Sequence, residues 1–135
     1  MVIGASTANF YPMLTEEALS TLLALGFGDI EVFLNSESEA TIKYAKALRR
    51  MAQQAGATIR AAHSYISVWE PFLLFTGYQR RFEDGLQLFE RLFVAAAEMG
   101  ADYVVLHGDR VGGVLSTEQY CERYEQLYDI GQIGR

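Results

Sequence analysis

The sequence predicts a parallel α/β fold built from four successive βα units, equivalent to half of an eight-stranded (β/α)8 barrel. Short apolar runs of strand length alternate with longer segments of helical periodicity along all 135 residues. Three of the four strand candidates are nearly continuous apolar runs, which is typical of strands that are buried on both faces. The first three candidates begin at residues 2, 30 and 58, and this constant interval indicates a repeated unit.

The strand candidates set the order of the predicted sheet. They are Val2 to Ala5, Ile30 to Leu34, Thr58 to Ala62 and Tyr103 to Leu106. The third interval is longer than the first two, and the additional residues lie between Ser64 and Tyr78. We interpret this segment as a loop inserted over the end of the sheet, where insertions often carry functional residues.

The first predicted helix follows the first strand. Thr15 is its candidate N-cap, and Glu16 and Glu17 stand in the first turn, where the helix dipole favours carboxylates. Gly26 is placed to end this helix, because glycine readily adopts the left-handed conformation found at many helix C-termini.

The second predicted helix begins near Ser36, because Ser36 and Glu39 have the spacing of a capping box. Its apolar side chains Ile42 and Ala45 are expected to face the core. Gly56 is expected to end the helix, as Gly26 ends the first one.

The third and fourth predicted helices complete the pattern. Apolar side chains of the third recur at alternating steps of four and three residues, at Phe82, Leu86, Phe89, Phe93 and Ala96. Gly100 is placed to end this helix, and Ser116 and Gln119 have capping-box spacing at the start of the fourth. The order of elements is therefore βαβαβαβα.

The repeat favours a barrel over an open, doubly wound sheet. An open nucleotide-binding sheet usually has a glycine-rich turn after its first strand, whereas residues 6–12 contain no glycine. The segment from Gly108 to Gly113 has neither GxGxxG nor Walker spacing. A complete barrel takes about 250 residues, so we expect residues 1–135 to form one domain that corresponds to about half of it.

Composition restricts the partners and the compartment that we expect. The net charge is -6 and the isoelectric point is near 4.9, so an acidic surface would repel nucleic acid. The apolar runs are too short to span a membrane, and no signal peptide is recognisable at the N-terminus. A single cysteine, Cys121, excludes an internal disulfide and fits the reducing cytoplasm. We therefore expect a cytoplasmic protein that has neither a nucleic-acid nor a membrane partner.

The two histidines of the chain stand at equivalent places, at the ends of neighbouring strands. His63 follows the third strand candidate and His107 follows the fourth. In a parallel barrel these ends meet at the active-site mouth, so we expect both imidazoles at one end of the sheet, within reach of one small ligand. The alternative is that each histidine only caps its strand by a hydrogen bond to a loop carbonyl.

Charged residues accompany the histidines. Glu31 lies inside an apolar strand, where a carboxylate requires a partner: it serves the site, or it pairs with Arg60 on the next strand. Asp109 and Arg110 follow His107 directly, as site residues or as a local ion pair. Glu70 lies in the insertion.

Several segments, in this order, resemble the sugar phosphate isomerase/epimerase family, whose fold is a xylose isomerase-like TIM barrel. The segments that carry the resemblance are residues 6–12, residues 30–35, His63, residues 70–72, residues 80–85 and residues 104–109. Each of them is short, but their order and spacing extend over the whole chain. The resemblance is therefore to the N-terminal half of such a barrel.

The resemblance implies an enzyme that shifts a proton between adjacent carbons of a sugar or sugar phosphate. It implies a divalent metal ion (Mn, Mg or Zn) in the complete barrel, where the metal polarises a carbonyl and a carboxylate is the base. The main metal ligands of the family come from later strands, so we expect no metal ligand in this chain and no activity from the chain alone. The substrate-binding residues that we expect are Glu31, His63, Glu70, His107, Asp109 and Arg110.

Two other interpretations are open. A four-stranded half-barrel has two unpaired sheet edges and invites self-association, so the chain could be a non-catalytic homodimer. The same superfamily includes zinc-dependent endonucleases for abasic DNA, in which histidines matching His63 and His107 are zinc ligands. The acidic composition argues against the endonuclease.

Overall fold

Four parallel strands form one sheet, in the order β1-β2-β3-β4. The structure is a computed structural model that describes residues 3–109 and 113–133. The strands are β1 (Ala5–Ser6), β2 (Asp29–Phe33), β3 (Thr58–His63) and β4 (Tyr103–Val105). Each strand neighbours its successor in the sequence and is parallel to it, so the predicted βα repeat is confirmed.

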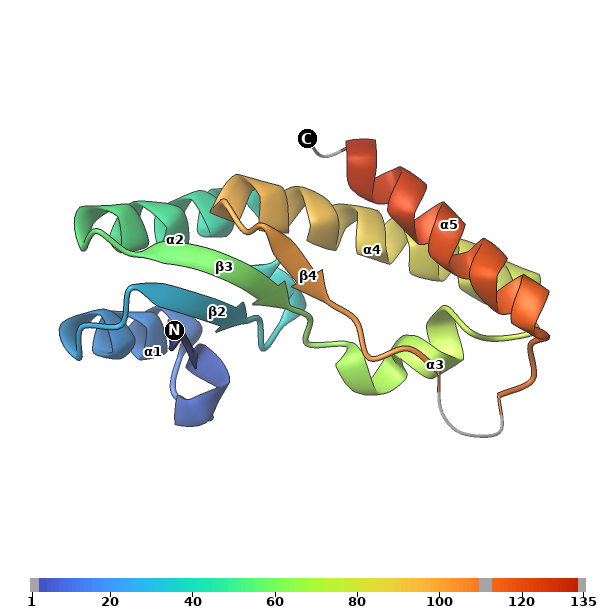
Figure 1. Cartoon of the computed structure of the whole chain (residues 1–135), viewed down its shortest axis with the longest axis horizontal. Coiled ribbons are helices and arrows are strands. Elements are labelled where there is room, and N and C mark those ends of the chain that lie inside the picture. The colour runs from blue at the N-terminus through green and yellow to red at the C-terminus, as the bar shows by residue number, and fades with distance from the viewer. Residues whose placement is uncertain (1–2, 110–112, 134–135) are drawn as a thin grey trace.

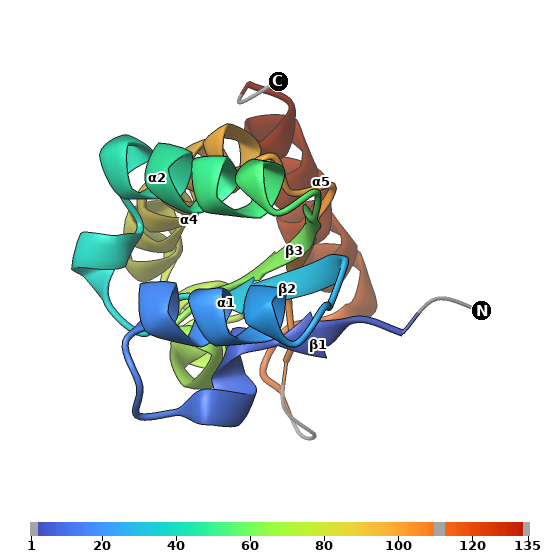
Figure 2. The same ribbon diagram turned by 90° about the vertical axis from the view of Figure 1, so that its left-hand side faces the viewer.

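Helices separate the strands and cover one face of the sheet. The α-helices are α1 (Thr15–Ala24), α2 (Ile42–Gln54), α3 (Glu70–Leu73), α4 (Gln79–Met99) and α5 (Thr117–Ile133). Short 3-10 helices follow β1, β2 and β3: η1 (Thr7–Phe10), η2 (Glu37–Glu39) and η3 (Ser67–Trp69). Helices α1, α2 and α4 lie on one side of the row of strands (Figure 2), and α5 packs along α4 (Figure 1). Within the described residues, no helix is long and apolar enough to cross a membrane.

The hydrophobic core lies between the sheet and these helices. Alternate residues of β2 point into it: Ile30 is 1% exposed and Val32 is fully buried. They meet apolar side chains of the helices, among them Leu19, Leu48 and Phe89, which are all fully buried. Burial of this surface is the main force that holds the helices on the sheet.

The other face of the sheet carries the remaining alternate residues. Glu31 and Phe33 on β2 are only partly buried, in register with Ser6 of β1 and His63 of β3 respectively. His63 is in turn in register with Val105 of β4. In a closed barrel this face would be the interior, so it is the face that brings polar side chains toward a central ligand.

Two boundaries near the N-terminus differ from the prediction. The first strand is Ala5–Ser6, so it shares only Ala5 with the predicted run from Val2 to Ala5. Ile3 and Gly4 lie before the strand, and Val2 lies outside the described residues. Thr15 is the first residue of α1 rather than its cap, and its hydroxyl donates to Glu39 Oε2 at 3.0 Å. The physical reason is that Thr15 is fully buried, where a partner on another element replaces the local capping bond.

The start of the second helix is also displaced. Ser36 precedes only the short η2, and its side chain makes no capping bond. Helix α2 begins after Thr41, whose hydroxyl accepts a hydrogen bond from Tyr44 N. Glu39 does not close a capping box because its carboxylate accepts from Asn35 N at 2.6 Å. The later start turns Ile42 outward, to 46% exposure, whereas Ala45 is buried as predicted.

Other predicted helix ends are confirmed. Gly100 ends α4 with φ at 84°, in the left-handed region that favours glycine. Ser116 and Gln119 form a reciprocal capping box at the start of α5, with Ser116 N donating to Gln119 Oε1 at 3.0 Å. The insertion between Ser64 and Tyr78 is real, and it contains η3 and α3.

Candidate functional site

The two histidines lie side by side at one end of the sheet. His63 is the last residue of β3, and His107 follows β4 by two residues. Their ring centroids are 4.8 Å apart, with an angle of 35° between the ring planes. The expectation that both imidazoles share one end of the sheet is therefore confirmed, because parallel neighbouring strands deliver their C-terminal ends to the same edge.

Glu31 lies on the β2 side of His63. Its Oε1 atom is 3.6 Å from His63 Nδ1, and it accepts a hydrogen bond of 2.7 Å from the Ser6 hydroxyl. The ring of Phe33 packs on the same imidazole, with centroids 4.5 Å apart. Period-two alternation places these side chains on the inner face, since Ser6 is in register with Glu31 and Phe33 with His63.

Glu31 does not pair with Arg60, so that alternative is wrong. Arg60 instead bonds Asp29 at 2.5 Å and Asp102 at 3.1 Å, near the start of the strands. A register shift between β2 and β3 lies between Ile30 and Glu31, and it aligns Glu31 with Ala61 rather than with Arg60. The two carboxylates raise the pKa of the exposed Arg60 guanidinium, through the Asp29 hydrogen bond first.

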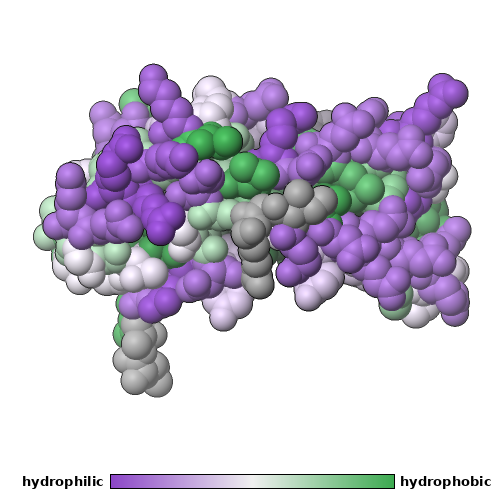
Figure 3. All heavy atoms as spheres, turned by 90° about the horizontal axis from the view of Figure 1, so that it is seen from above, coloured by the Kyte–Doolittle hydropathy of each residue, from purple (hydrophilic) through white to green (hydrophobic). Residues whose placement is uncertain are grey.

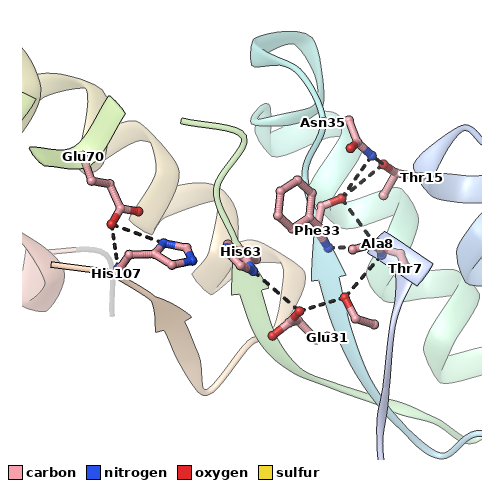
Figure 4. Close-up of polar contacts among 10 residues, drawn as sticks. Thr7, Ala8, Thr15, Glu31, Phe33, Asn35, His63, Glu70 and His107 are labelled. Atoms are coloured by element: carbon pink, nitrogen blue, oxygen red, sulfur yellow. Dashed lines mark hydrogen bonds and ion pairs between the residues drawn. The ribbon is translucent and has the colours of Figure 1, made fainter. Parts of the chain in front are cut away.

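Glu70 lies on the other side of the histidine pair, on α3 of the insertion. Its side chain is completely buried, and Oε2 accepts a hydrogen bond of 2.6 Å from His107 N. The same oxygen is 3.5 Å from His107 Nδ1. Figure 4 shows the resulting row, with Glu31 and Glu70 on opposite sides of the two imidazoles. Four of the six residues expected in the site are thus brought together.

Two atoms in this row are buried without a hydrogen-bond partner among the described residues: His63 Nε2 and Glu70 Oε1. Buried polar atoms are nearly always paired, and an unpaired one costs about 1–3 kcal/mol. Each such atom calls for a physical explanation, of which a role in catalysis or in binding an ion is one. The side chain of His107 is 47% exposed, so the row also has a face that is open to solvent.

Asp109 lies in the turn that follows His107. Its backbone N–H donates to the Tyr120 hydroxyl at 3.1 Å, and Tyr120 stacks on Phe75 with centroids 4.7 Å apart. Gly108 adopts φ 77° here, and a Cβ at this position would lie 2.9 Å from the Tyr120 hydroxyl. Burial raises the pKa of the neighbouring Tyr124, and so does its hydrogen bond with Tyr120. Arg110, the sixth expected site residue, lies outside the described residues.

The sequence does not indicate the supporting side chains of the site. Phe33 stands there only within a predicted strand and the segment 30–35, and Tyr120 and Tyr124 lie in the fourth predicted helix with no role in the site. The available signals were local: Phe33 alternates with the buried Val32, and the two tyrosines share a helix face at a spacing of four residues. Neither signal shows which distant residue such a side chain meets.

The row offers neutral donors and acceptors as well as charge. An imidazole nitrogen without a proton accepts a hydrogen bond from a hydroxyl, and a carboxylate accepts two or more. Among the described residues, no three histidine, cysteine, aspartate or glutamate side chains are grouped so that they could hold a metal ion. The nitrogen and oxygen acceptors of the row can each pair with a hydroxyl donor.

Comparison with known proteins gives structural matches only. No protein-family model matches the chain, and neither does any curated protein sequence. Among solved structures, D-psicose 3-epimerase with D-tagatose from Clostridium cellulolyticum H10 is similar, with a TM-score of 0.76 and 11% identity over 99% of this chain and 50% of that one. The 3-keto-D-glucoside 4-epimerase of E. coli, apo form, has a TM-score of 0.68 and 17% identity over 99% and 53%.

A third similar structure is a xylose isomerase domain protein from Planctomyces limnophilus, with a TM-score of 0.65 and 15% identity over 99% of this chain and 48% of that one. The chain thus spans about half the length of the structures that it matches. At these identities the likeness establishes the fold. Four consecutive parallel βα units, aligned over nearly their full length with half of each such structure, give this chain the fold of half a xylose isomerase-like TIM barrel.

Proposed function

We propose that this chain supplies one wall of the substrate site of a sugar isomerase or epimerase, which shifts a proton between adjacent carbons of a carbohydrate. The observation that carries the proposal is the row Glu31, His63, His107 and Glu70 at the C-terminal ends of the strands. In barrels of this kind, active sites lie at that end. The structures that share the fold include epimerases named for D-psicose and 3-keto-D-glucoside.

The chemistry of the row supports a polyhydroxylated substrate. The two imidazoles are close enough for neighbouring hydroxyl groups of one sugar to reach both rings. Glu31 is one-third exposed and accepts a bond from Ser6, so its second oxygen can accept from a further hydroxyl. Asp109, and Arg110 next to it in the sequence, complete the set of proposed substrate-binding residues. The substrate class is a sugar or a sugar phosphate.

The proposed reaction draws on a divalent metal ion, Mn, Mg or Zn, which would polarise the substrate carbonyl. The described residues do not group three ligands for such an ion, so this part of the chain does not fit a complete metal site. We propose that its residues bind and orient the substrate, and that metal ligands are supplied by other strands of a complete barrel. The single cysteine supports a reducing compartment, the cytoplasm.

Solvent deuterium exchange tests the proposal. The test uses the whole polypeptide that the gene encodes, because this chain alone is expected to be inactive. It is incubated in D2O with Mn, Mg or Zn and with D-psicose, D-tagatose, D-fructose or a 3-keto-D-glucoside. Deuterium is expected at the carbon next to the carbonyl, detected by NMR. His63→Asn and His107→Asn are each expected to lower the exchange rate about fivefold, the effect of one lost hydrogen bond of about 1 kcal/mol.

The matched control is Gln53→Ala, an exposed change on α2, which is expected to leave the rate unchanged. Exchange that is undiminished in both histidine variants would contradict the assigned site. Absence of exchange with every sugar and metal would contradict the proposed reaction.

A second candidate, self-association, is favoured by the edge of the sheet. Strand β4 is an edge strand within the described residues, and a groove of about 350 Å3 separates it from α5. Its lining includes Phe93, Val104 and Leu127, and Tyr103 on the exposed edge is 70% exposed. Apolar atoms also reach the surface between hydrophilic ones on the face shown in Figure 3. Such an edge can pair with a strand of a second copy.

Light scattering coupled to size-exclusion chromatography measures the oligomeric state directly. A homodimer is expected under the second candidate, and Tyr103→Lys on the exposed edge is expected to return it to a monomer. A wild-type chain that runs as a monomer with cooperative unfolding would contradict self-association and leave the substrate-site proposal standing.

A further inference from the structure

We propose that Glu70 is a positioning residue that acts through His107: its buried carboxylate fixes the backbone of the turn at residues 107–109 and sets which imidazole nitrogen faces the site. The inference rests on the proposed function, because it assigns Glu70 to the support of the site rather than to contact with the substrate. The insertion between β3 and α4 thereby controls the geometry of a residue that follows β4.

The burial of Glu70 is the first step of the argument. Helix α3 exposes its aromatic side chains, with Trp69 next to its start at 61% exposure and Phe72 at 45%, and it buries its carboxylate completely. Hydrophobic burial alone would produce the opposite orientation. A polar group removed from water requires a hydrogen-bonded partner, so the partner of Glu70 explains why the side chain points inward.

That partner is the backbone of His107. The bond from His107 N to Glu70 Oε2 is 2.6 Å long and joins residues 37 positions apart in the sequence. This distance lies at the short end of the range for N–H···O hydrogen bonds in proteins. His107 follows the end of β4, so its N–H has no ladder partner described in the sheet and is satisfied by the insertion instead.

The imidazole of His107 is oriented by the same oxygen. Nδ1 lies 3.5 Å from Glu70 Oε2. A nitrogen lone pair that faced the carboxylate at this distance would be repelled, whereas an Nδ1–H is attracted. Neutral His107 is therefore expected to carry its proton on Nδ1 and to present the Nε2 lone pair, which accepts a hydrogen bond from a hydroxyl donor.

The turn has a second anchor on its far side. The Tyr120 hydroxyl accepts the hydrogen bond from Asp109 N, and Tyr120 stacks on Phe75, another residue of the insertion. Glu70 and Phe75 thus hold residues 107–109 from two directions, directly and through α5. Because of these two attachments, the position of residues 107–109 does not depend on the short strand β4 alone. Within the described residues, β4 pairs with a neighbouring strand on one side only.

The pair of Glu31 and His63 provides an internal control. Glu31 Oε1 stands 3.6 Å from His63 Nδ1, the same relationship on the neighbouring strand. Glu31, however, accepts its hydrogen bond from the Ser6 side chain rather than from the backbone of its histidine. A change at Glu70 should consequently alter His107 and leave His63 as it was.

The test is the tautomer of each histidine, read by long-range 1H–15N NMR on the polypeptide labelled with 15N-histidine, in alkaline buffer where free imidazole is neutral. In the wild type, Nδ1 of His107 is expected to show the shift of a protonated nitrogen, and Nε2 that of an unprotonated one. In Glu70→Gln the amide oxygen that accepts from His107 N is also the atom that faces Nδ1, so the Nδ1 proton is expected to remain. In Glu70→Leu no acceptor faces Nδ1, so the two 15N shifts are expected to approach those of free histidine.

The proposal is supported if Glu70→Leu moves the two 15N shifts of His107 alone toward those of free histidine, while Glu70→Gln leaves them as in the wild type. Glu31→Leu is the matched variant and should change His63 alone. Glu83→Leu, an exposed change on α4, should change neither. Unchanged shifts of His107 in a Glu70→Leu protein that still unfolds cooperatively, or equal changes at both histidines, would overturn it. Because the readout needs no substrate, failure here is distinguishable from failure of the deuterium exchange.

Discussion

His63 packs against His107 with ring centroids 4.8 Å apart, and its other neighbour is the ring of Phe33 at 4.5 Å. His63 is the middle one of these three rings, and its Nε2 is buried without a hydrogen-bond partner among the described residues. His63 therefore has two separable roles, because its ring fills space between two aromatic side chains while its nitrogens give the site its chemistry.

Two substitutions at His63 separate packing from chemistry. His63→Phe keeps a ring between Phe33 and His107 and removes an unpaired buried nitrogen, so its free energy of unfolding is expected to lie within about 1 kcal/mol of the wild type. His63→Ala removes both ring contacts and is expected to lose about 1–3 kcal/mol, since each aromatic pair contributes about 0.5–1.5 kcal/mol. Urea unfolding measures both values. Equal stability of the two variants would show that the ring contributes no packing energy.

The start of α2 gives a test of capping. Thr41→Ala removes the side-chain oxygen that accepts from Tyr44 N, and the expected loss is about 1 kcal/mol in the free energy of unfolding. Ser36→Ala is the matched control, because Ser36 has the sequence signature of a cap but makes no capping bond. Thermal or urea unfolding measures the loss of stability in each variant. A larger loss for Ser36→Ala than for Thr41→Ala would show that Ser36, the cap predicted from the sequence, is the residue that stabilises the helix start.

Gly108 is expected to tolerate no side chain. Gly108→Ala combines φ 77° with a Cβ 2.9 Å from the Tyr120 hydroxyl and 3.0 Å from the Tyr124 hydroxyl. The left-handed conformation alone costs a non-glycine residue about 1–2 kcal/mol, and displacement of the tyrosines adds to it. Gly28→Ala is the control, with nothing within 4 Å of the added Cβ. The free energy of unfolding should fall clearly in Gly108→Ala and stay close to the wild-type value in Gly28→Ala. Comparable losses in the two variants would contradict the observed geometry around Gly108.

Alkaline pH should reveal the hydrogen bond between Tyr44 and Glu16. The Tyr44 hydroxyl donates to Glu16 Oε2 at 2.6 Å, and burial, followed by this bond, raises the pKa of Tyr44 in the folded chain. A raised pKa means that the stabilisation is fully present below the unfolded pKa of about 10 and is lost as pH increases above it. The free energy of unfolding should therefore decline above about pH 10, and less steeply in Tyr44→Phe.

Tyr11→Phe is the matched control for this titration, because Tyr11 is 73% exposed. It should leave the alkaline decline unchanged. The measurement is a series of urea unfolding curves at increasing pH. A Tyr44→Phe protein with the same decline as the wild type would show that the buried hydroxyl is not among the groups responsible.

The site was predictable in part. His63 and His107 could be placed together from sequence because both follow strands of a parallel repeat, and the ends of such strands share one edge. The partner of Glu31 could not be chosen between the site and Arg60, because the choice depends on a register shift between β2 and β3. The shift leaves Arg60 as an extra residue in β3 between the partners of Ile30 and Glu31, and the sequence does not show where along a pair of strands such an irregularity falls.

The sequence alone determined the βα repeat, the end of α4 at Gly100 and the capping box at Ser116, since periodicity and caps depend on residues within a few positions of one another. Only the tertiary structure decided that Glu70 is buried against His107 and that Thr15 bonds Glu39 instead of capping its helix. The physical reason is that a buried polar group takes whichever partner the folded chain brings within hydrogen-bond distance, and for Glu70 that partner is 37 residues away.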